Sequence, residues 1–241
     1  MSSKMIRGLT IFSTGNEELD GRLGGGIPHP AFILIEGENG TAKTTLAAQI
    51  MFGALSAGYR VVLFTTESTA KQFINQTRLI SLDLTKFYIK GQLIIYSLYS
   101  GGYEASAEAI KAAFNNLVQF LFSSQNNFDI VVIDSLTVFL NYVGDVAISR
   151  FIQTVRRLIS RGSSLMATIH SGVIEERVAK ALRAASDVYY KLGLANVGGK
   201  TVKVLQIVKA RGAPEPIEGT LAFDVDPAFG IKIVPVVIAQ S

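Results

Sequence analysis

One eight-residue segment constrains the fold more than any other part of the chain. It reads Gly37-Glu38-Asn39-Gly40-Thr41-Ala42-Lys43-Thr44, and it lies between an apolar run over residues 32–35 and a helical pattern over about residues 43–57. A glycine-rich turn that joins a buried strand to a helix directs backbone N–H groups and the positive end of the helix toward an anion. The segment is typical of a P-loop, in which the lysine reaches the β- and γ-phosphates of a nucleotide and the following hydroxyl binds Mg²⁺.

The segment departs from the P-loop pattern at one position, because Ala42 stands where the pattern has glycine. We expect its methyl group to crowd the phosphate or to shift the loop slightly without abolishing binding, because alanine is well tolerated in a first helical turn. The alternative is a helix capped by a glycine-rich turn, which leaves the lysine and the threonine unexplained. The residues predicted to bind the nucleotide are Gly37, Asn39, Gly40, Thr41, Ala42, Lys43, Thr44 and Thr45.

Three more polar residues follow apolar runs that read as core strands. Asp134 ends the run 130–133, which is the Walker B arrangement, and we expect it to hold Mg²⁺ through water together with Thr44. Glu67 follows the run 61–64, where a carboxylate can orient and deprotonate an attacking water; the alternative is a residue that caps the next helix. His170 follows the run 165–169 and is predicted to sense the γ-phosphate or orient water, or only to form a hydrogen bond at a strand end.

The alternation of apolar strands with helical patterns predicts an α/β fold with a parallel sheet. Strands are expected at 32–35, 61–64, 93–96, 130–133 and 165–169, and helices at about 43–57, 104–122 and 148–160. Strand patterns at 188–194, 202–208, 220–225 and 231–234, with a turn at 196–199, predict an antiparallel C-terminal extension. His29, between two prolines, is expected in a turn. We expect one domain over residues 1–241.

Composition excludes several classes of protein. Apolar residues make up 49% of the 241 residues and charged residues 17%, which is the opposite of a disordered chain. No stretch approaches the roughly 18 consecutive apolar residues of a spanning helix. The absence of cysteine excludes disulfides and thiol catalysis. We therefore expect a cytoplasmic protein.

Two further segments carry a resemblance. Ser13-Thr14-Gly15-Asn16-Glu17-Glu18-Leu19-Asp20, followed by Leu23-Gly24-Gly25-Gly26-Ile27-Pro28, resembles the opening of the RecA/RadA/KaiC ATPases, and Ile133-Asp134-Ser135-Leu136-Thr137 is also similar to theirs. The resemblance implies a RecA-like core, ATP and Mg²⁺ as ligands, and Glu67 as the catalytic glutamate. KaiC domains usually carry two adjacent glutamates there, whereas Ser68 occupies the second position here.

Lys209-Ala210-Arg211-Gly212 resembles the Lys-x-Arg-Gly of KaiC domains. The resemblance implies that Lys209 and Arg211 act across a subunit interface on a neighbour's γ-phosphate. A charge that acts in this way implies a homo-oligomer, either a ring, with a hexamer as one form, or a filament. The alternative is an exposed basic pair at a strand end.

Within that superfamily, the chain is similar to KaiC-like accessory proteins of the archaeal flagellum, the archaellum. Length, layout and Phe223-Asp224-Val225-Asp226-Pro227 carry the likeness. It implies an ATP-binding regulatory or assembly component at the cytoplasmic face of the motor, with slow or no hydrolysis and contact with the membrane only through the motor. The implied partners are the motor ATPase FlaI and a ring scaffold protein.

Two alternatives stay open at this point. A RadA- or RadB-type recombinase paralogue, with a DNA-stimulated ATPase, would need a basic surface for the DNA backbone. The candidates for that surface are Arg150, Arg156, Arg157, Arg161, Arg177, Lys180 and Arg183, although a solvated helix face explains them as well and nucleic acid is not an expected partner. KaiC-like self-phosphorylation is the second alternative, because hydroxyl residues surround Glu67 at Thr65, Thr66, Ser68 and Thr69.

Overall fold

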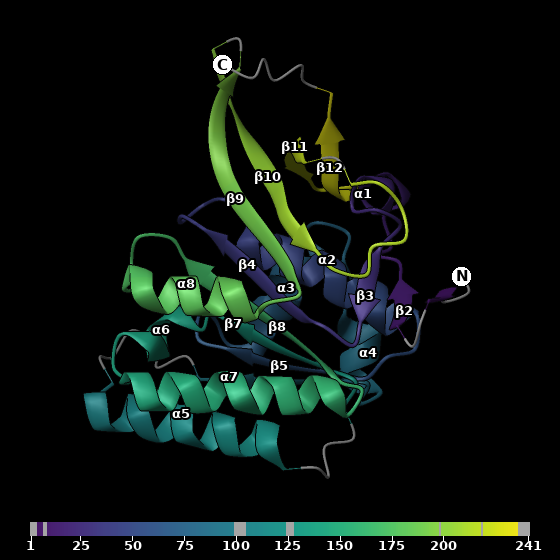
Figure 1. Ribbon diagram of the computed structural model, residues 1–241. Helices are drawn as coiled ribbons and strands as arrows, with labels where there is room; N and C mark the ends of the chain where they lie inside the picture. Colours follow the sequence, from purple (N-terminus) through teal and green to yellow (C-terminus); the bar gives the residue numbers. More distant parts are fainter. Residues whose placement is uncertain are drawn as a thin grey trace.

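A nine-stranded sheet forms the centre of the molecule (Figure 1), in the order β12-β11-β10-β9-β4-β8-β7-β5-β6. This computed structural model describes residues 4–6, 9–98, 105–123, 128–197, 199–217 and 219–235. The sheet consists of β4 (Phe32–Gly37), β5 (Val61–Thr65), β6 (Leu93–Ser97), β7 (Ile130–Asp134), β8 (Ser164–His170), β9 (Val188–Val197), β10 (Lys200–Ala210), β11 (Thr220–Asp226) and β12 (Gly230–Val234).

The pairing divides this sheet into two parts. The strands from β9 to β6 in that order are parallel to their neighbours, because helical crossovers connect them. The strands β9, β10, β11 and β12 pair antiparallel in chain order. The predicted mostly parallel sheet with antiparallel C-terminal strands is therefore confirmed.

Helices cover both faces of the sheet (Figure 1). They are α1 (Glu17–Arg22), α2 (Lys43–Ser56), α3 (Ala70–Arg78), α4 (Thr85–Ile89), α5 (Ala107–Phe122), α6 (Thr137–Leu140), α7 (Asp145–Ser160) and α8 (Glu176–Ala185). Alternate residues of β4 serve two cores, since Ile33 and Ile35 pack with α2, whereas Phe32 and Leu34 pack with α5 and α7. Because both faces are buried, the central strands are apolar throughout.

The N-terminal part of the chain adds structure that the sequence patterns did not predict. Strands β1 (Lys4–Ile6), β2 (Leu9–Phe12) and β3 (Ile27–His29) form a small antiparallel sheet. The expectation that His29 lies in a turn is wrong, because this buried residue ends β3 and its Nδ1 lies 2.7 Å from the Ser164 hydroxyl.

Element boundaries differ from the predictions by a few residues. Helix α7 begins three residues earlier than expected, because Gly144 provides its N-cap, and β9 and β10 extend to the turn between them. The expected start of α5 at Glu104, and Gly198 in the expected turn, lie outside the described residues. Among the helices of the described ranges, none is both long and apolar enough to span a membrane.

Candidate functional site

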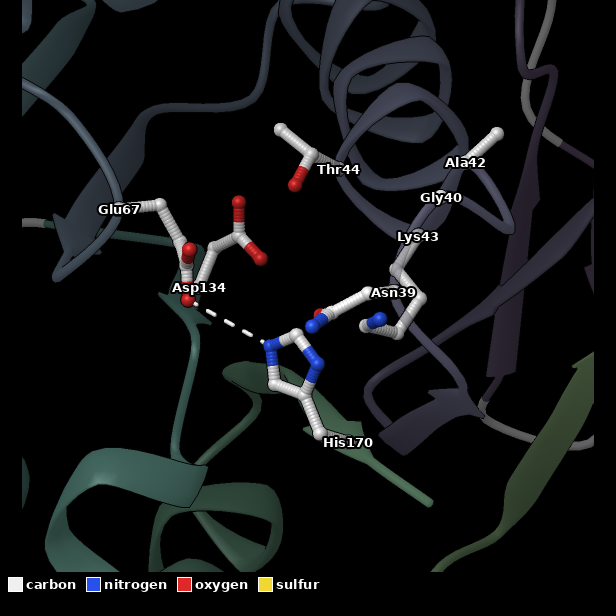
Figure 2. Close-up of a pocket in the computed structure, with 8 residues that line it drawn as sticks. All are labelled: Asn39, Gly40, Ala42, Lys43, Thr44, Glu67, Asp134 and His170. Atoms are coloured by element: carbon white, nitrogen blue, oxygen red, sulfur yellow. Dashed lines mark ion pairs between the residues drawn. The ribbon is translucent and has the colours of Figure 1, made fainter. Parts of the chain in front are cut away.

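Four parallel strands end at the same edge of the sheet, and the predicted strand-end residues meet there. Gly37 at the end of β4 is in register with His170 at the end of β8, and Thr65 of β5 is in register with Asp134 of β7. A cavity of about 220 Å³ lies at this edge (Figure 2). It is lined by Asn39, Gly40, Ala42, Lys43, Thr44, Glu67, Asp134 and His170.

Ala42 has a different conformation from the one expected. It is the N-cap of α2, outside the first helical turn, and its backbone is left-handed, with φ 70° and ψ 32°. A residue with a Cβ is strained in that conformation, which explains why the P-loop pattern prefers glycine at this position. Figure 2 shows the Ala42 methyl group directed away from the other lining side chains, and it packs against the core on the α2 face. The methyl group therefore has a cost in the backbone conformation, and steric crowding at the phosphate stays a prediction.

Lys43 and Thr44 open α2 and face the cavity (Figure 2). Lys43 is only 6% exposed, and its ammonium group donates a hydrogen bond of 2.8 Å to the Glu38 carbonyl. Burial lowers the pKa of Lys43, and the negative charges of Asp134 and Glu67 oppose this effect. A buried cation beside a helix N-terminus favours an anionic ligand such as a phosphate.

Asp134 is a buried carboxylate, and only one of its two oxygens accepts a hydrogen bond among the described residues. Its Oδ1 accepts a hydrogen bond of 2.6 Å from the Thr168 hydroxyl, whereas Oδ2 has no hydrogen-bond partner among the described residues. Burial raises the pKa of Asp134, and the hydroxyls of Thr168 and Thr44 oppose this rise. An unpartnered buried carboxylate oxygen is costly unless a cation compensates it.

The donor set at Asp134 fits Mg²⁺. Figure 2 shows the Thr44 hydroxyl directed toward the Asp134 carboxylate, and both are oxygen donors of the kind that Mg²⁺ prefers. No group of three or more His, Asp and Glu side chains suited to a metal occurs in the described ranges. The ion would therefore be held by Thr44, Asp134, waters and the phosphates of the nucleotide, as is usual for Mg²⁺.

Glu67 and His170 face each other at the mouth of the cavity. The His170 Nε2 lies 3.5 Å from the Glu67 Oε1 (Figure 2), and the Glu67 side chain is 45% exposed, against 18% for His170. The His170 amide donates to the Thr137 hydroxyl, and the Glu67 amide donates to the Thr65 hydroxyl. The geometry brings together the two side chains that were predicted to orient water.

A buried ionic network supports the start of the P-loop. Glu36, which directly precedes Gly37, accepts two hydrogen bonds from Arg183 of α8, at 2.7 and 2.6 Å, and one of 2.8 Å from the Tyr189 hydroxyl. Ser171, next to His170, donates a longer bond of 3.3 Å. Burial of Glu36 raises the pKa of its carboxyl, but these bonds prevail and hold the pKa below its usual value.

Lys209 and Arg211 lie away from the cavity in the same chain. Lys209 pairs with Tyr189, which pairs with Leu34 near the beginning of β4, whereas the P-loop follows the end of that strand. The Lys209 ammonium donates to backbone carbonyls at the C-terminal end of α8, including that of Ser186. Arg211 is exposed and lies 3.8 Å from Asp187.

Three residues of the predicted cradle are not among those that line the cavity. Thr41 is buried and its hydroxyl donates to the Glu38 carbonyl. A Cβ on Gly37 would lie 2.6 Å from that hydroxyl oxygen, so glycine is required there. Thr45 follows Thr44 in the first turn of α2 and is half-buried.

Sequence reasoning missed two contributors. Thr168 fixes the Asp134 carboxylate, and Arg183 neutralises Glu36. Thr168 had a signal, since it is a hydroxyl residue within the apolar run that leads to His170. Arg183 had none, because only the fold brings α8 against β4.

Comparisons with known proteins agree with this fold and site. A family model described as "ATPase: KaiC" matches residues 12–237. The chain belongs to this KaiC family of ATPases. It is also 36% identical to the archaeal flagellar ATP-binding protein FlaH of Sulfolobus acidocaldarius over 96% of this chain and 100% of that protein. This similarity places the chain in the FlaH group of the family.

More distant relatives point the same way. FlaH of Methanocaldococcus jannaschii is 24% identical over 95% of this chain and 97% of that protein. The crystal structure of the flagellar accessory protein FlaH from the same organism superposes with a TM-score of 0.81, covering 92% of this chain and 96% of that one. At that level of identity, the likeness to the crystal structure confirms the RecA-like fold alone.

Proposed function

We propose that this chain is an ATP-binding regulatory component of the archaellum motor, which uses bound Mg-ATP as a switch for oligomerisation or partner binding. The observation that carries the proposal is the cavity at the sheet edge, where Lys43, Thr44 and the unpartnered Asp134 oxygen face one another in a chain of the FlaH group. The lysine provides positive charge for the phosphates, and the two oxygen donors provide a place for Mg²⁺.

We expect slow hydrolysis because the pair predicted to orient water, Glu67 and His170, is incomplete in a single chain. A general base acts best when the site excludes water and fixes its position. Glu67 is nearly half exposed, and its neighbour Ser68 supplies no second carboxylate. A completed site therefore needs a further group from outside this chain, and the bound nucleotide persists as a signal in its absence.

A neighbouring subunit is the proposed source of that group. Since Lys209 and Arg211 lie away from the cavity of their own chain, their predicted action on a γ-phosphate calls for a second copy. A heterologous contact of this kind generates a ring if its rotation closes and a filament if it does not. We extend the proposal to one ATPase domain over residues 1–241, working in the cytoplasm at the motor with FlaI and a ring scaffold as partners.

The test measures mass in solution against nucleotide. Light scattering after size-exclusion chromatography is expected to show a larger species with Mg-ATP than with Mg-ADP or without nucleotide. An Arg211→Glu variant is expected to keep ATP binding but to lose the larger species. An oligomeric state that does not respond to nucleotide would contradict the switch.

The recombinase alternative receives no support from these findings. The named relatives are flagellar, and two candidate DNA-binding arginines are engaged elsewhere, since Arg177 pairs with Asp145 and Arg183 with Glu36. ATP turnover is expected to be slow and indifferent to single-stranded DNA at low salt. A marked stimulation by DNA would favour the recombinase.

Hydrogen bonds of three of the four hydroxyls around Glu67 disfavour self-phosphorylation there. The Thr66 hydroxyl bonds with the Ser135 backbone, and the Thr69 hydroxyl forms the capping box of α3. The Thr65 hydroxyl accepts from the Glu67 amide. Mass spectrometry after incubation with ATP is expected to find no phosphate on the protein.

A further inference from the structure

The fold divides the basic residues of α7 and α8 into two groups. On α8, Arg177 contacts Asp145 and Glu175, and Arg183 contacts Glu36 and Glu176. On α7, by contrast, Arg150, Arg156 and Arg157 have no acidic partner among the described residues, and all three are exposed. The charge of α7 is therefore available to a partner.

Two of these arginines line a groove between α5 and α7. The two helices run side by side on one face of the sheet (Figure 1), and between them lie two hollows of about 420 and 380 Å³ that share Val118 and Arg150. We call this the α5–α7 groove and define it by Asn115, Val118 and Phe122 of α5 and by Ala147, Arg150 and Arg157 of α7. It lies on the opposite face of the sheet from α2, the helix that follows the phosphate-binding turn, and from the core around that helix.

The groove contains apolar and positively charged side chains, with Gln119, Gln153 and Thr154 as further polar groups at its Arg157 end. Val118 is buried at its centre and Phe114 lies beneath one end, while Val146 at the rim is 85% exposed. Arg157 stacks on the Phe122 ring, with its guanidinium carbon 4.3 Å from the ring centroid, so the guanidinium is held at the wall. An exposed apolar surface bordered by oriented charges is typical of a protein-docking surface.

The charge around the groove is mostly positive, although Asp145 lines one end of it. The acidic residues of the two helices are Glu108 and Asp145, and Asp145 already pairs with Arg177. Against them stand Lys111, Arg150, Arg156, Arg157 and Arg161. Arg150 and Arg157 are seven residues apart, which is about 10 Å along one face of a helix.

We propose that the α5–α7 groove binds an acidic amphipathic helix of a partner protein. Apolar side chains of that helix would cover Val118 and Phe122, and two carboxylates seven residues apart would pair with Arg150 and Arg157. A polypeptide fits better than a nucleic acid, since Phe114, Val118 and Phe122 provide apolar contacts in the groove and only one of the groove arginines stacks on an aromatic ring. The groove lies apart from the nucleotide site. A failure of the groove proposal can therefore be distinguished from a failure of the ATP proposal.

Matched synthetic peptides test the proposal on the full-length protein. The probe is a fluorescent helical peptide of about 20 residues, roughly 30 Å long, with a leucine face and two glutamates seven residues apart. Its counterpart carries lysine at the same two positions. By fluorescence anisotropy, we expect the glutamate peptide to bind the protein at least about tenfold more tightly than the lysine peptide.

Charge-reversal variants distinguish binding in this groove from nonspecific attraction to the positive charge of α7. The affinity of the Arg150→Glu/Arg157→Glu variant for the glutamate peptide is expected to fall by about tenfold or more, and its affinity for the lysine peptide is expected to rise. A misfolded variant would not gain affinity for the lysine peptide. The matched control Arg156→Glu changes the charge of the same helix outside the groove and is expected to change affinity less than about twofold.

Three results would overturn the proposal. One is no binding of the glutamate peptide at concentrations up to about 1 mM. Another is an equal loss in the Arg156→Glu control. The last is displacement of the peptide by single-stranded oligothymidylate at lower concentration than by unlabelled peptide, which would assign the arginines to nucleic acid.

Discussion

Ala42 is the residue whose environment differs most from its sequence pattern. The sequence placed it in a helix, whereas the structure places it at the left-handed N-cap of α2, where alanine is disfavoured by about 1–2 kcal/mol. The strain lies at the phosphate-binding turn, so it is a property of the site and not of the core.

Replacement of Ala42 by glycine is expected to raise the free energy of unfolding by up to about 1 kcal/mol, since relief of the left-handed strain exceeds the added entropy of the unfolded chain. Denaturant titration measures the change. The control Ala109→Gly, in the exposed first part of α5, is expected to lose about 1 kcal/mol because glycine is a poor helix former. A loss of stability in both variants would contradict the assigned conformation of Ala42.

Asp134 offers a prediction in which protonation and metal binding are linked. Because burial raises the pKa of Asp134, its ionisation disfavours the folded protein as the pH rises above the unfolded pKa, and a bound cation reverses this. Asp134→Asn is therefore expected to leave the ligand-free protein at neutral pH as stable as the parent or more so. Thermal unfolding at several pH values measures this.

The same variant is expected to lose the stabilisation that Mg-ATP provides. For the parent protein, that stabilisation is about 2.7 kcal/mol when the ligand is present at 100 times its dissociation constant. Mg²⁺ should no longer strengthen ATP binding in the variant. If Mg²⁺ strengthened ATP binding as much in Asp134→Asn as in the parent protein, Asp134 would not belong to the metal site.

Individual site residues were predictable where the strand pattern fixed their place. Asp134 and His170 follow apolar strands, and parallel strands bring their ends together. The backbone conformation of Ala42 and the partner of Glu36 were not predictable, because both depend on contacts between segments distant in sequence.

At the scale of elements, α8 is joined to the P-loop strand through one ion pair. The Glu36 side chain is 3% exposed, so removing Arg183 leaves a buried, unpaired carboxylate. Arg183→Gln is expected to lower the free energy of unfolding by about 3 kcal/mol and to weaken ATP binding, because Gly37 begins the phosphate turn.

Two further variants make this prediction specific. Glu36→Gln/Arg183→Gln is expected to recover much of the stability, since no unpaired charge remains. Arg177→Gln, which removes an exposed ion pair of the same helix, is expected to have little effect. Equal effects of Arg177→Gln and Arg183→Gln in denaturant titration would contradict the network.

Elements with a continuous apolar run or a clear helical period were predictable, whereas the short N-terminal elements and the nine-residue helix α3 were not. Strands β4, β5 and β7 contain continuous apolar runs, and α5 has a clear helical period. Strands β1 and β3 have three residues each and α1 has six, so their formation depends on packing against the rest of the molecule.

At the scale of the whole molecule, one edge of a parallel sheet holds the candidate site and the distant end of β10 holds Lys209 and Arg211. This separation means that one chain offers a nucleotide site and a basic pair on different parts of its surface. The account therefore rests first on nucleotide binding by the single chain, from which the oligomeric switch follows.

Isothermal titration of Mg-ATP into the parent protein, Lys43→Ala and the exposed control Lys71→Ala tests that claim most directly. We predict one ATP per chain for the parent and for Lys71→Ala. For Lys43→Ala we predict a loss of affinity of roughly tenfold to a hundredfold, the worth of one charged hydrogen bond to phosphate. Thermal melts confirm that each variant is folded. A Lys43→Ala protein that binds Mg-ATP as tightly as the parent would contradict the assignment of this site.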